Sequence, residues 1–222
     1  MSKKTVAFVP MKLNNQRLPG KNTKAFKNGK PLLTYILSAL SKCTEADEIY
    51  VYCSNEDVKE YLPANVKYLK RSEELDKNST LILEVLKAFA SDVDADVYTL
   101  AHATAPFIRP QTIDTAIRKV RDEGYDSAFT AKKVQEFLWT DGKPNYDTKK
   151  IPRTQDLTST YAETTGLYVY TKDLINNGRR IGDNPYILEV DFIEATDINE
   201  PIDFDIAQVV LDKYINSADE NE

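Results

Sequence analysis

The residues best suited to chemistry follow a short apolar run, residues 6–9, near the start of the chain. The run ends at Pro10, and the polar stretch behind it is rich in cationic and amide side chains, among them Lys12, Arg17, Lys21 and Asn22. Ammonium and guanidinium groups that share one loop with backbone N–H groups can hold an anion such as phosphate. Ligands in open α/β sheets bind beyond the carboxyl ends of the strands, and this loop follows the first predicted strand. The stretch therefore predicts an anion site, with an ordinary basic surface loop as the alternative.

Three further polar clusters lie after predicted strands or before the last predicted helix. They are Arg71 with Ser72, Ser79 and Thr80; His102 with Thr104; and Asp197 with Asn199 and Asp203. Cationic loops and carboxylates at one edge of a sheet suit a nucleoside triphosphate together with its Mg²⁺. The sequence contains neither GxxxxGK[ST] nor GxGxxG, so it predicts neither a P-loop nor a dinucleotide site.

Composition argues against several classes of function. The formal net charge of −6 does not suit general nucleic-acid binding, which needs a broadly cationic surface. No apolar run approaches the ~20 residues of a membrane span, and we expect no signal peptide either. Cys43 and Cys53 are expected to be free thiols in a cytoplasmic protein. One histidine and two cysteines argue against a zinc site, so a metal here should be a hard cation held by oxygen.

Strands and helices alternate along most of the chain. The expected strands are residues 5–9, 48–54, 66–69, 96–101, 126–131, 166–170 and 186–190. The expected helices are residues 31–42 and 55–61, one capped by Ser79 or Thr80, two that start at residues 110 and 172, and 201–215. We expect the last helix to turn four apolar side chains inward: Ile206, Val209, Val210 and Tyr214. Alternation with short connections predicts an α/β fold, with a doubly wound, mostly parallel sheet that has helices on both faces.

The alternation breaks in a segment at about residues 133–163. This segment contains Trp139, Pro144, Pro152 and a long polar run, and it has no helical period. A long irregular stretch in a compact domain is usually functional or reaches a partner. We therefore expect a single domain over residues 1–222 with an arm at this segment, and we assign Trp139 to packing within the arm or its interface.

Motifs in register resemble those of the acylneuraminate (sialic acid) cytidylyltransferases, which activate 2-keto-3-deoxy sugar acids with CTP. The family's P-A-R-x-G-S-K-x-[IL]-P-x-K-N corresponds to residues 10–22, PMKLNNQRLPGKN, and its Q-P-T-S-P-L to residues 102–107, HATAPF. The family's R-x-Q-D-L and E-N-G-A-[IV]-Y correspond to residues 153–157, RTQDL, and 163–168, ETTGLY. Its closing D-I-D-x-x-x-D-F corresponds to residues 197–204, DINEPIDF. The motifs keep their order and spacing over nearly the whole chain.

The resemblance implies a Rossmann-like nucleotidyltransferase domain that moves CMP from CTP to the anomeric hydroxyl of a sugar acid and releases pyrophosphate. It implies Mg²⁺ as cofactor. It also implies a homodimer in which the irregular arm serves as the dimerisation excursion and helps to form the partner's sugar site. No nucleic-acid or membrane partner is expected.

On this interpretation each predicted site residue has a role. Lys12 and Lys21 hold the triphosphate, and Asp197 holds Mg²⁺ with Asp203 behind it. The nucleotide side also contains Arg17, Asn22, Arg71, Ser79 and Thr80. The sugar side contains His102, Thr104, Arg153, Gln155 and Glu163, with Arg153 as the partner of the acceptor's carboxylate. The base that takes the sugar hydroxyl proton is not evident.

The chain departs from the family pattern at several positions. Lys12 stands where the family has arginine, and it loses the bidentate fork to phosphate. His102 replaces a glutamine, and Asn199 replaces the second carboxylate of D-I-D. These departures leave two alternatives: transfer to a different sugar or polyol phosphate or from a different nucleotide, and a non-catalytic nucleotide-binding relative.

Purely structural roles also remain open at the individual positions. Asp197 can be a turn residue with Asn199 as the helix N-cap. Arg153 and Gln155 can satisfy loop carbonyls. His102 can be a satisfied histidine at a strand end.

Overall fold

The computed structural model describes residues 3–13 and 18–216, so the predicted phosphate contact of Arg17 lies outside the described residues. The main strands are β1 (Thr5–Met11), β2 (Glu48–Cys53), β3 (Val66–Lys70), β4 (Val97–Ala101), β5 (Ser127–Val134), β8 (Thr160–Thr171) and β9 (Pro185–Glu189). The α-helices are α1 (Leu32–Ser41), α2 (Ile82–Asp92), α3 (Pro110–Arg121), α4 (Lys172–Asn176) and α5 (Pro201–Val210). Short 3₁₀ turns cover Lys21–Thr23, Glu56–Tyr61, Glu73–Asp76 and Thr154–Asp156.

These seven strands form one sheet in the order β3-β2-β1-β4-β8-β5-β9. Strands β3, β2, β1 and β4 pair in parallel, and β9 pairs in parallel with β5. Strand β8 runs antiparallel to both of its neighbours, β4 and β5. The predicted mostly parallel α/β sheet is therefore confirmed, with one reversed strand, β8, between β4 and β5.

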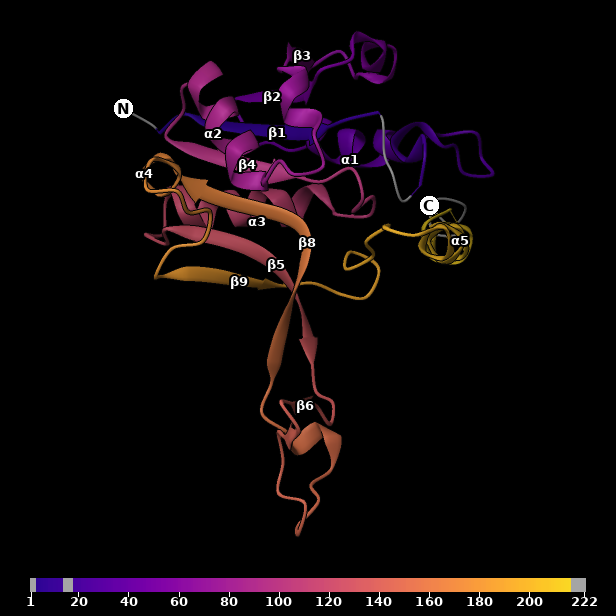
Figure 1. Cartoon of the computed structure of the whole chain (residues 1–222), viewed down its shortest axis with the longest axis vertical. Coiled ribbons are helices and arrows are strands. Elements are labelled where there is room, and N and C mark those ends of the chain that lie inside the picture. The colour runs from indigo at the N-terminus through magenta and orange to yellow at the C-terminus, as the bar shows by residue number, and fades with distance from the viewer. Residues whose placement is uncertain (1–2, 14–17, 217–222) are drawn as a thin grey trace.

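Helices cover both faces of the sheet (Figure 1), as the alternation predicted. Alternate residues of β1 point to opposite faces, as the two-residue period of a strand requires. Ala7 and Val9 belong to a core with α1 and α3. Val6 and Phe8 belong to a core with α2 and α4, where the ring of Phe8 stacks on that of Phe89 with centroids 3.8 Å apart.

A third, smaller core fixes the loops at the carboxyl end of β1 and before α5. It joins Phe26, Leu32, Phe107, Ile198 and Phe204, and the rings of Phe26 and Phe204 stack with centroids 4.5 Å apart. Because Ile198 is buried in this core, the residues on either side of it are held in place beside the loop after β1.

The prediction of which face of the last helix is buried is largely wrong. Only Val210 is buried, while Ile206, Val209 and Tyr214 are exposed. Phe204, Ala207 and Leu211 face the core instead, and a π-helical turn over Leu211–Ile215 changes the period at the end of α5. The expectation failed because this helix is apolar on two faces, so its periodicity did not identify the buried one.

The helix after residue 80 is not capped by Ser79 or Thr80. Its N-cap is Leu81, whose backbone N–H donates to the Glu84 carboxylate at 2.6 Å. The predicted cap of the 3₁₀ turn at Glu56–Tyr61 is confirmed, because the Asn55 side chain accepts from the Asp57 N–H.

The segment at residues 133–163 is an arm with more regular structure than expected. Strands β5 and β8 continue past the sheet as a two-stranded ribbon that pairs Val134 with Thr160. A short hairpin follows, formed by the two-residue strands β6 (Trp139–Thr140) and β7 (Lys143–Pro144). Figure 1 shows this arm projecting from the body of the molecule. The ribbon was missed because its residues are exposed and carry no apolar alternation. No helix in the part of the chain that the structure describes is long and apolar enough to cross a membrane.

Candidate functional site

A pocket of about 310 Å³ opens at the carboxyl ends of β1 and β4. Seven of the predicted site residues line it: Lys12, Lys21, Asn22, Arg71, Thr80, His102 and Thr104. They come from three of the four polar clusters in the sequence, and the sheet brings them together because parallel strands end at one edge. Ser79 is exposed and does not line this pocket.

The two lysines of the loop after β1 donate hydrogen bonds to backbone carbonyls in other parts of the chain. The buried Lys21 ammonium donates to the Ile198 carbonyl at 2.7 Å. The Lys21 backbone begins a 3₁₀ turn directly after Gly20, whose φ of +67° suits glycine. The Lys12 ammonium donates to the Asp76 carbonyl at 2.9 Å and to Asn78 Oδ1 at 3.0 Å. Both ammonium groups therefore have fixed positions at the pocket.

The Arg71 side chain is already paired within the protein, unlike an arginine that is free to bind phosphate. Its guanidinium is buried, and Nε and Nη2 both donate to Asp76 Oδ1, the first at 3.1 Å. The other oxygen of Asp76 accepts from the Ser54 hydroxyl at 2.5 Å. Arg71 thus forms part of the wall through Asp76, a residue that the sequence did not single out, and its contact with a nucleotide stays a prediction.

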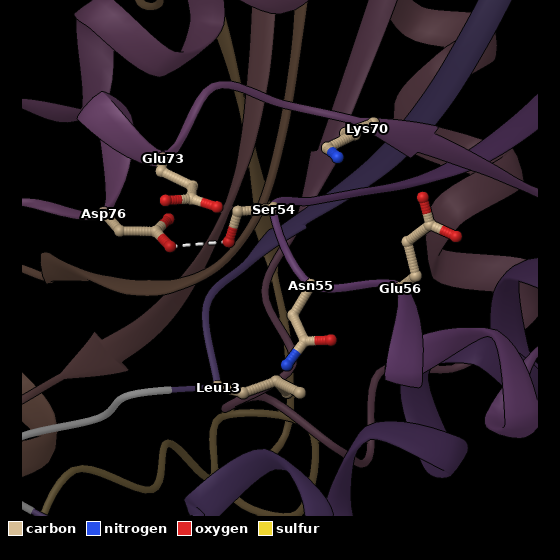
Figure 2. A pocket seen from close by; sticks show the side chains of 7 residues that line it. All are labelled: Leu13, Ser54, Asn55, Glu56, Lys70, Glu73 and Asp76. Carbon is tan, nitrogen blue, oxygen red and sulfur yellow. Dashed lines mark hydrogen bonds between the residues drawn. The ribbon is translucent and has the colours of Figure 1, made fainter.

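A larger pocket of about 720 Å³ lies on the other side of Asp76. Figure 2 shows the carboxylates of Glu73 and Asp76 beside the Ser54 hydroxyl, with Lys70 and Glu56 on the other side of the opening. Three carboxylates against one ammonium group disfavour a polyphosphate. The smaller pocket is therefore the better triphosphate site.

His102 follows β4 and lies close to three charged groups. Its backbone N–H donates to the Gly166 carbonyl at 3.0 Å, and a Cβ on Gly166 would lie 2.8 Å from Ala105, so only glycine allows this close approach. Burial, together with the cationic Arg180 and Lys21, lowers the pKa of His102 to about 4, against the opposing charge of Asp197. The imidazole is therefore neutral near pH 7, and its buried Nε2 has no partner among residues 3–13 and 18–216.

Asp197 is oriented by two side-chain donors. Its Oδ2 accepts from Asn199 Nδ2 at 2.6 Å and from the Thr165 hydroxyl at 3.2 Å, while Thr165 has the unusual φ of +57°. The other oxygen, Oδ1, is buried and finds no hydrogen-bond partner in the described chain. Asp197 lines a neighbouring pocket of about 110 Å³ together with Lys132 and Asp203. An oriented carboxylate with one unsatisfied oxygen fits a hard cation.

Asp203 lies in the first turn of α5 and caps the start of this helix. Its Oδ2 accepts from the backbone N–H groups of Asn199 at 2.9 Å and Glu200 at 2.8 Å. The N-cap of α5 is Glu200 rather than Asn199, which corrects the alternative raised from sequence. Among the described residues no group of three or more His, Cys, Asp or Glu side chains could hold a metal by itself. A cation here would need Asp197 together with oxygen atoms of a substrate.

Glu163, at the start of the ribbon, belongs to a group that sequence reasoning recognised only in part. Its Oε2 accepts from the Tyr168 hydroxyl at 2.6 Å and lies 3.9 Å from Arg180 Nη2. The guanidinium of Arg180 stacks over the Tyr168 ring, 3.8 Å from its centroid. Tyr168 lay within a quoted motif but was assigned no role, and the basic pair at residues 179–180 was the only local signal for Arg180.

Arg153 and Gln155 lie in the arm and do not line the pocket of the same chain. Arg153 pairs with Asp156 through two hydrogen bonds of 2.7 and 2.9 Å, and the Gln155 carbonyl faces Gln135. Within one chain these residues stabilise the arm, and their contact with a sugar acid stays a prediction.

Comparison with known proteins gives a consistent result. The chain matches the family described as Cytidylyltransferase over residues 6–196. It is 25% identical over 213 residues to N-acylneuraminate cytidylyltransferase A of Danio rerio, with 91% of this chain and 49% of that protein covered. It is 34% identical over 120 residues to CMP-N,N'-diacetyllegionaminic acid synthase of Legionella pneumophila, with 50% of this chain and 51% of that protein covered. The chain spans about half the length of the curated relatives it matches.

The fold resembles that of CMP:2-keto-3-deoxy-manno-octonic acid synthetase complexed with CTP, with a TM-score of 0.69 at 16% identity, covering 96% of this chain and 100% of that one. It also resembles 4-diphosphocytidyl-2C-methyl-D-erythritol synthase of Anaerococcus prevotii, with a TM-score of 0.66 at 16% identity, covering 95% and 97%. These likenesses confirm the Rossmann-like fold. With the match over residues 6–196, they lead to one conclusion: the chain belongs to the cytidylyltransferase family.

Proposed function

We propose that this protein transfers CMP from CTP to a hydroxyl group of a sialic-acid-like 2-keto-3-deoxy sugar acid and releases pyrophosphate. The observation that carries the proposal is the pocket at the end of β1, where Lys12, Lys21 and Asn22 meet His102 and Thr104 from the end of β4. The family and the named relatives support cytidine as the base and a sugar acid as the acceptor.

The reaction needs positioning and charge neutralisation rather than a covalent intermediate. The acceptor oxygen forms a bond to the α-phosphorus of CTP as the bond to the bridging β-phosphate oxygen breaks, and the hydroxyl proton passes to solvent or a nearby base. Lys12 and Lys21 neutralise the departing pyrophosphate. Their ammonium groups are already fixed by protein carbonyls, so little ordering is needed on binding.

Asp197 is the residue that would hold Mg²⁺. Its unsatisfied Oδ1 fits the preference of this ion for one or two carboxylates with phosphate and water completing the shell. When bound, the ion screens the triphosphate during attack. Asn199 donates a hydrogen bond to Asp197 and orients its carboxylate. Because Asn199 stands where the family has a second carboxylate, Asp197 would be the single charged ligand of the ion.

The protein is further proposed to be a cytoplasmic homodimer. Phe137, Trp139, Ile151 and Tyr161 are exposed apolar side chains of the arm, which suits contact with a second copy. Cys43 and Cys53 are free thiols, which suits a reducing compartment. Replacing residues 136–158 by a short Asn-Gly turn should give a monomer by light scattering, and a dimer that persists would remove the arm from the interface.

Pyrophosphate release measured with CTP, UTP, ATP and GTP against a set of sugar acids and polyol phosphates tests the function. We expect turnover with CTP and a sugar acid, and only when Mg²⁺ is present. Turnover with another pair would establish the first alternative. CTP binding without turnover on any acceptor would establish the non-catalytic alternative.

A further inference from the structure

Arg180 occupies an unusual position in the loop between α4 and β9. One face of its guanidinium lies on the Tyr168 ring, 3.8 Å from the centroid, and its side chain is 24% exposed. Stacking on an aromatic ring fixes the plane of a guanidinium while its N–H groups point outward from the edge. The edge of Arg180 is therefore held in a defined direction.

The other arginines that the structure describes are all tightly paired. Each has a carboxylate oxygen within 3.1 Å: Arg71, Arg109, Arg118, Arg121, Arg153 and Arg179. The ion pair of Arg180 is longer, at 3.9 Å from Glu163. That carboxylate already accepts a hydrogen bond of 2.6 Å from Tyr168. Arg180 is thus the described arginine whose charge is least satisfied by the protein.

Unsatisfied polar atoms lie on the same side of the site. His102 Nε2 and Asp197 Oδ1 are both buried without a hydrogen-bond partner in the described residues. Contacts along β8 bring the groups around these atoms together: Thr165 donates to Asp197, Gly166 accepts from the His102 backbone N–H, and Tyr168 carries the stacked Arg180. Lys21 lines the volume beside His102 as part of the triphosphate pocket, and Arg180 lies over Tyr168, two residues after Gly166.

We infer that Arg180 binds an oxyanion of the acceptor, a carboxylate or a phosphate, beside His102 and Asp197. A planar guanidinium matches both anions through two parallel N–H···O bonds. Tyr168 and Glu163 position the guanidinium from behind. The inference rests on the proposed function and assigns within one chain the anion contact that sequence reasoning gave to Arg153, which is already paired with Asp156.

The first test separates acceptor binding from nucleotide binding. Arg180→Ala should raise the KM for the acceptor about 10- to 100-fold, as loss of a hydrogen bond to a charged group does, and should change the KM for CTP less than about 2-fold. Arg179→Ala is the matched control, because Arg179 is adjacent but pairs with Asp183 on the surface, and it should leave both constants unchanged. An unchanged acceptor KM in Arg180→Ala, or an equal rise for CTP, would overturn the inference.

Arg180→Lys keeps the charge but loses the planar fork, so its acceptor KM should lie between those of wild type and Arg180→Ala. Tyr168→Phe keeps the ring and removes its hydrogen bond to Glu163, so the acceptor KM should rise only a few-fold. Thermal unfolding of each variant shows that it folds. If the folded variants Arg180→Lys and Arg180→Ala were equally impaired, toward CTP as well as toward the acceptor, a structural role would replace the binding role.

The second test does not need turnover. His102 is the only histidine of the chain, so its ring signals in nuclear magnetic resonance report this volume unambiguously. With CTP and EDTA present to occupy the triphosphate pocket, N-acetylneuraminate or glycerol 3-phosphate should shift these signals in wild type and not in Arg180→Gln. The ligand that saturates at lower concentration identifies the anion as carboxylate or phosphate. A wild type that responds to neither ligand, or a variant that responds equally, would overturn the inference. Anion binding without turnover would overturn only the proposed function.

Discussion

On the side of the site that faces the loop after β1, the protein already holds its cationic groups. Lys12 and Lys21 donate to backbone carbonyls, and Arg71 is locked by Asp76. On the other side, which faces β8 and the loop before α5, buried atoms of His102 and Asp197 have no partner in the described chain. We call these the phosphate side and the acceptor side. The difference indicates that the phosphate side is organised before substrate binds, whereas the acceptor side is completed by substrate, metal or a second chain.

The largest effect should come from the phosphate side. Lys21→Met keeps most of the length of the side chain and removes the charge that is proposed to face the pyrophosphate. We expect kcat/KM for CTP to fall about 10²- to 10³-fold, as loss of one preorganised electrostatic stabiliser does. Steady-state pyrophosphate release measures this effect, with Lys30→Met at an exposed position as control. Wild-type kinetics in Lys21→Met would place the triphosphate elsewhere.

Asp197 tests the acceptor side. Asp197→Asn should lower kcat on the order of 10²-fold, because the proposed metal loses its charged ligand, and should barely change the free energy of unfolding. Asp203→Ala is the matched comparison: it removes a helix cap, so it should cost about 1 kcal/mol of stability and change kcat less. Mg²⁺ titrations of activity distinguish the two. An unchanged titration in Asp197→Asn would remove this residue from the metal site.

The sequence grouped the residues that line the pocket on the phosphate side, but it identified only part of the group around Glu163 on the acceptor side. The loop after β1 is local: a strand, a break at Pro10 and closely spaced cations together define it. Arg180 could not be predicted, because its role depends on the loop after α4 folding across β8 to reach Tyr168, and nothing near it in sequence reports that contact. Asp76 was missed for a similar reason, since its function is to satisfy a buried arginine rather than to touch a ligand.

Prediction of the fold also succeeded where the signal in the sequence is local and failed where it is not. Alternating strands and helices in the first 131 residues predicted the parallel sheet, because each buried element carries its own periodic signal. The buried part of β8 was predicted at residues 166–170, but its reversed direction and its extension into the ribbon were not, since pairing such as that of Val134 with Thr160 has no local signal in the sequence. The inward face of α5 was misassigned because apolar side chains lie on both faces of that helix.

Asp76→Asn should reveal how rigid the phosphate side is. It leaves the buried Arg71 guanidinium without its anionic partner, so we expect a loss of about 3 kcal/mol in the free energy of unfolding and a rise of roughly 10-fold in the KM for CTP. Ser54→Ala removes only the hydroxyl that donates to the same carboxylate and should cost about 1 kcal/mol. Urea unfolding and CTP kinetics measure both variants. Equal losses in the two would show that the Arg71 pair stabilises little.

The smallest effect on activity is expected at His102, where the consequence is instead a dependence of stability on pH. Burial and the charge of Arg180 lower the pKa of this imidazole to about 4 in the folded state, below the value of 6.5 for an ordinary histidine. The unfolded chain therefore takes up this proton at higher pH than the folded protein does. Stability is lost as the pH falls from about 6.5 towards 4, and the loss is complete below that value.

His102→Gln removes this titration and restores the neutral amide that the family carries, so kcat/KM should change by less than about 10-fold. Relative to wild type, the variant should gain stability as the pH falls, by about 2 kcal/mol at pH 5 compared with pH 8. The carboxylates of the protein titrate in part of the same pH range, but they are common to both proteins and cancel in the comparison, so urea unfolding of both at pH 8, 6 and 5 isolates the histidine. A difference in unfolding free energy that stays constant with pH would show that His102 titrates normally and that the acceptor side is already open to water.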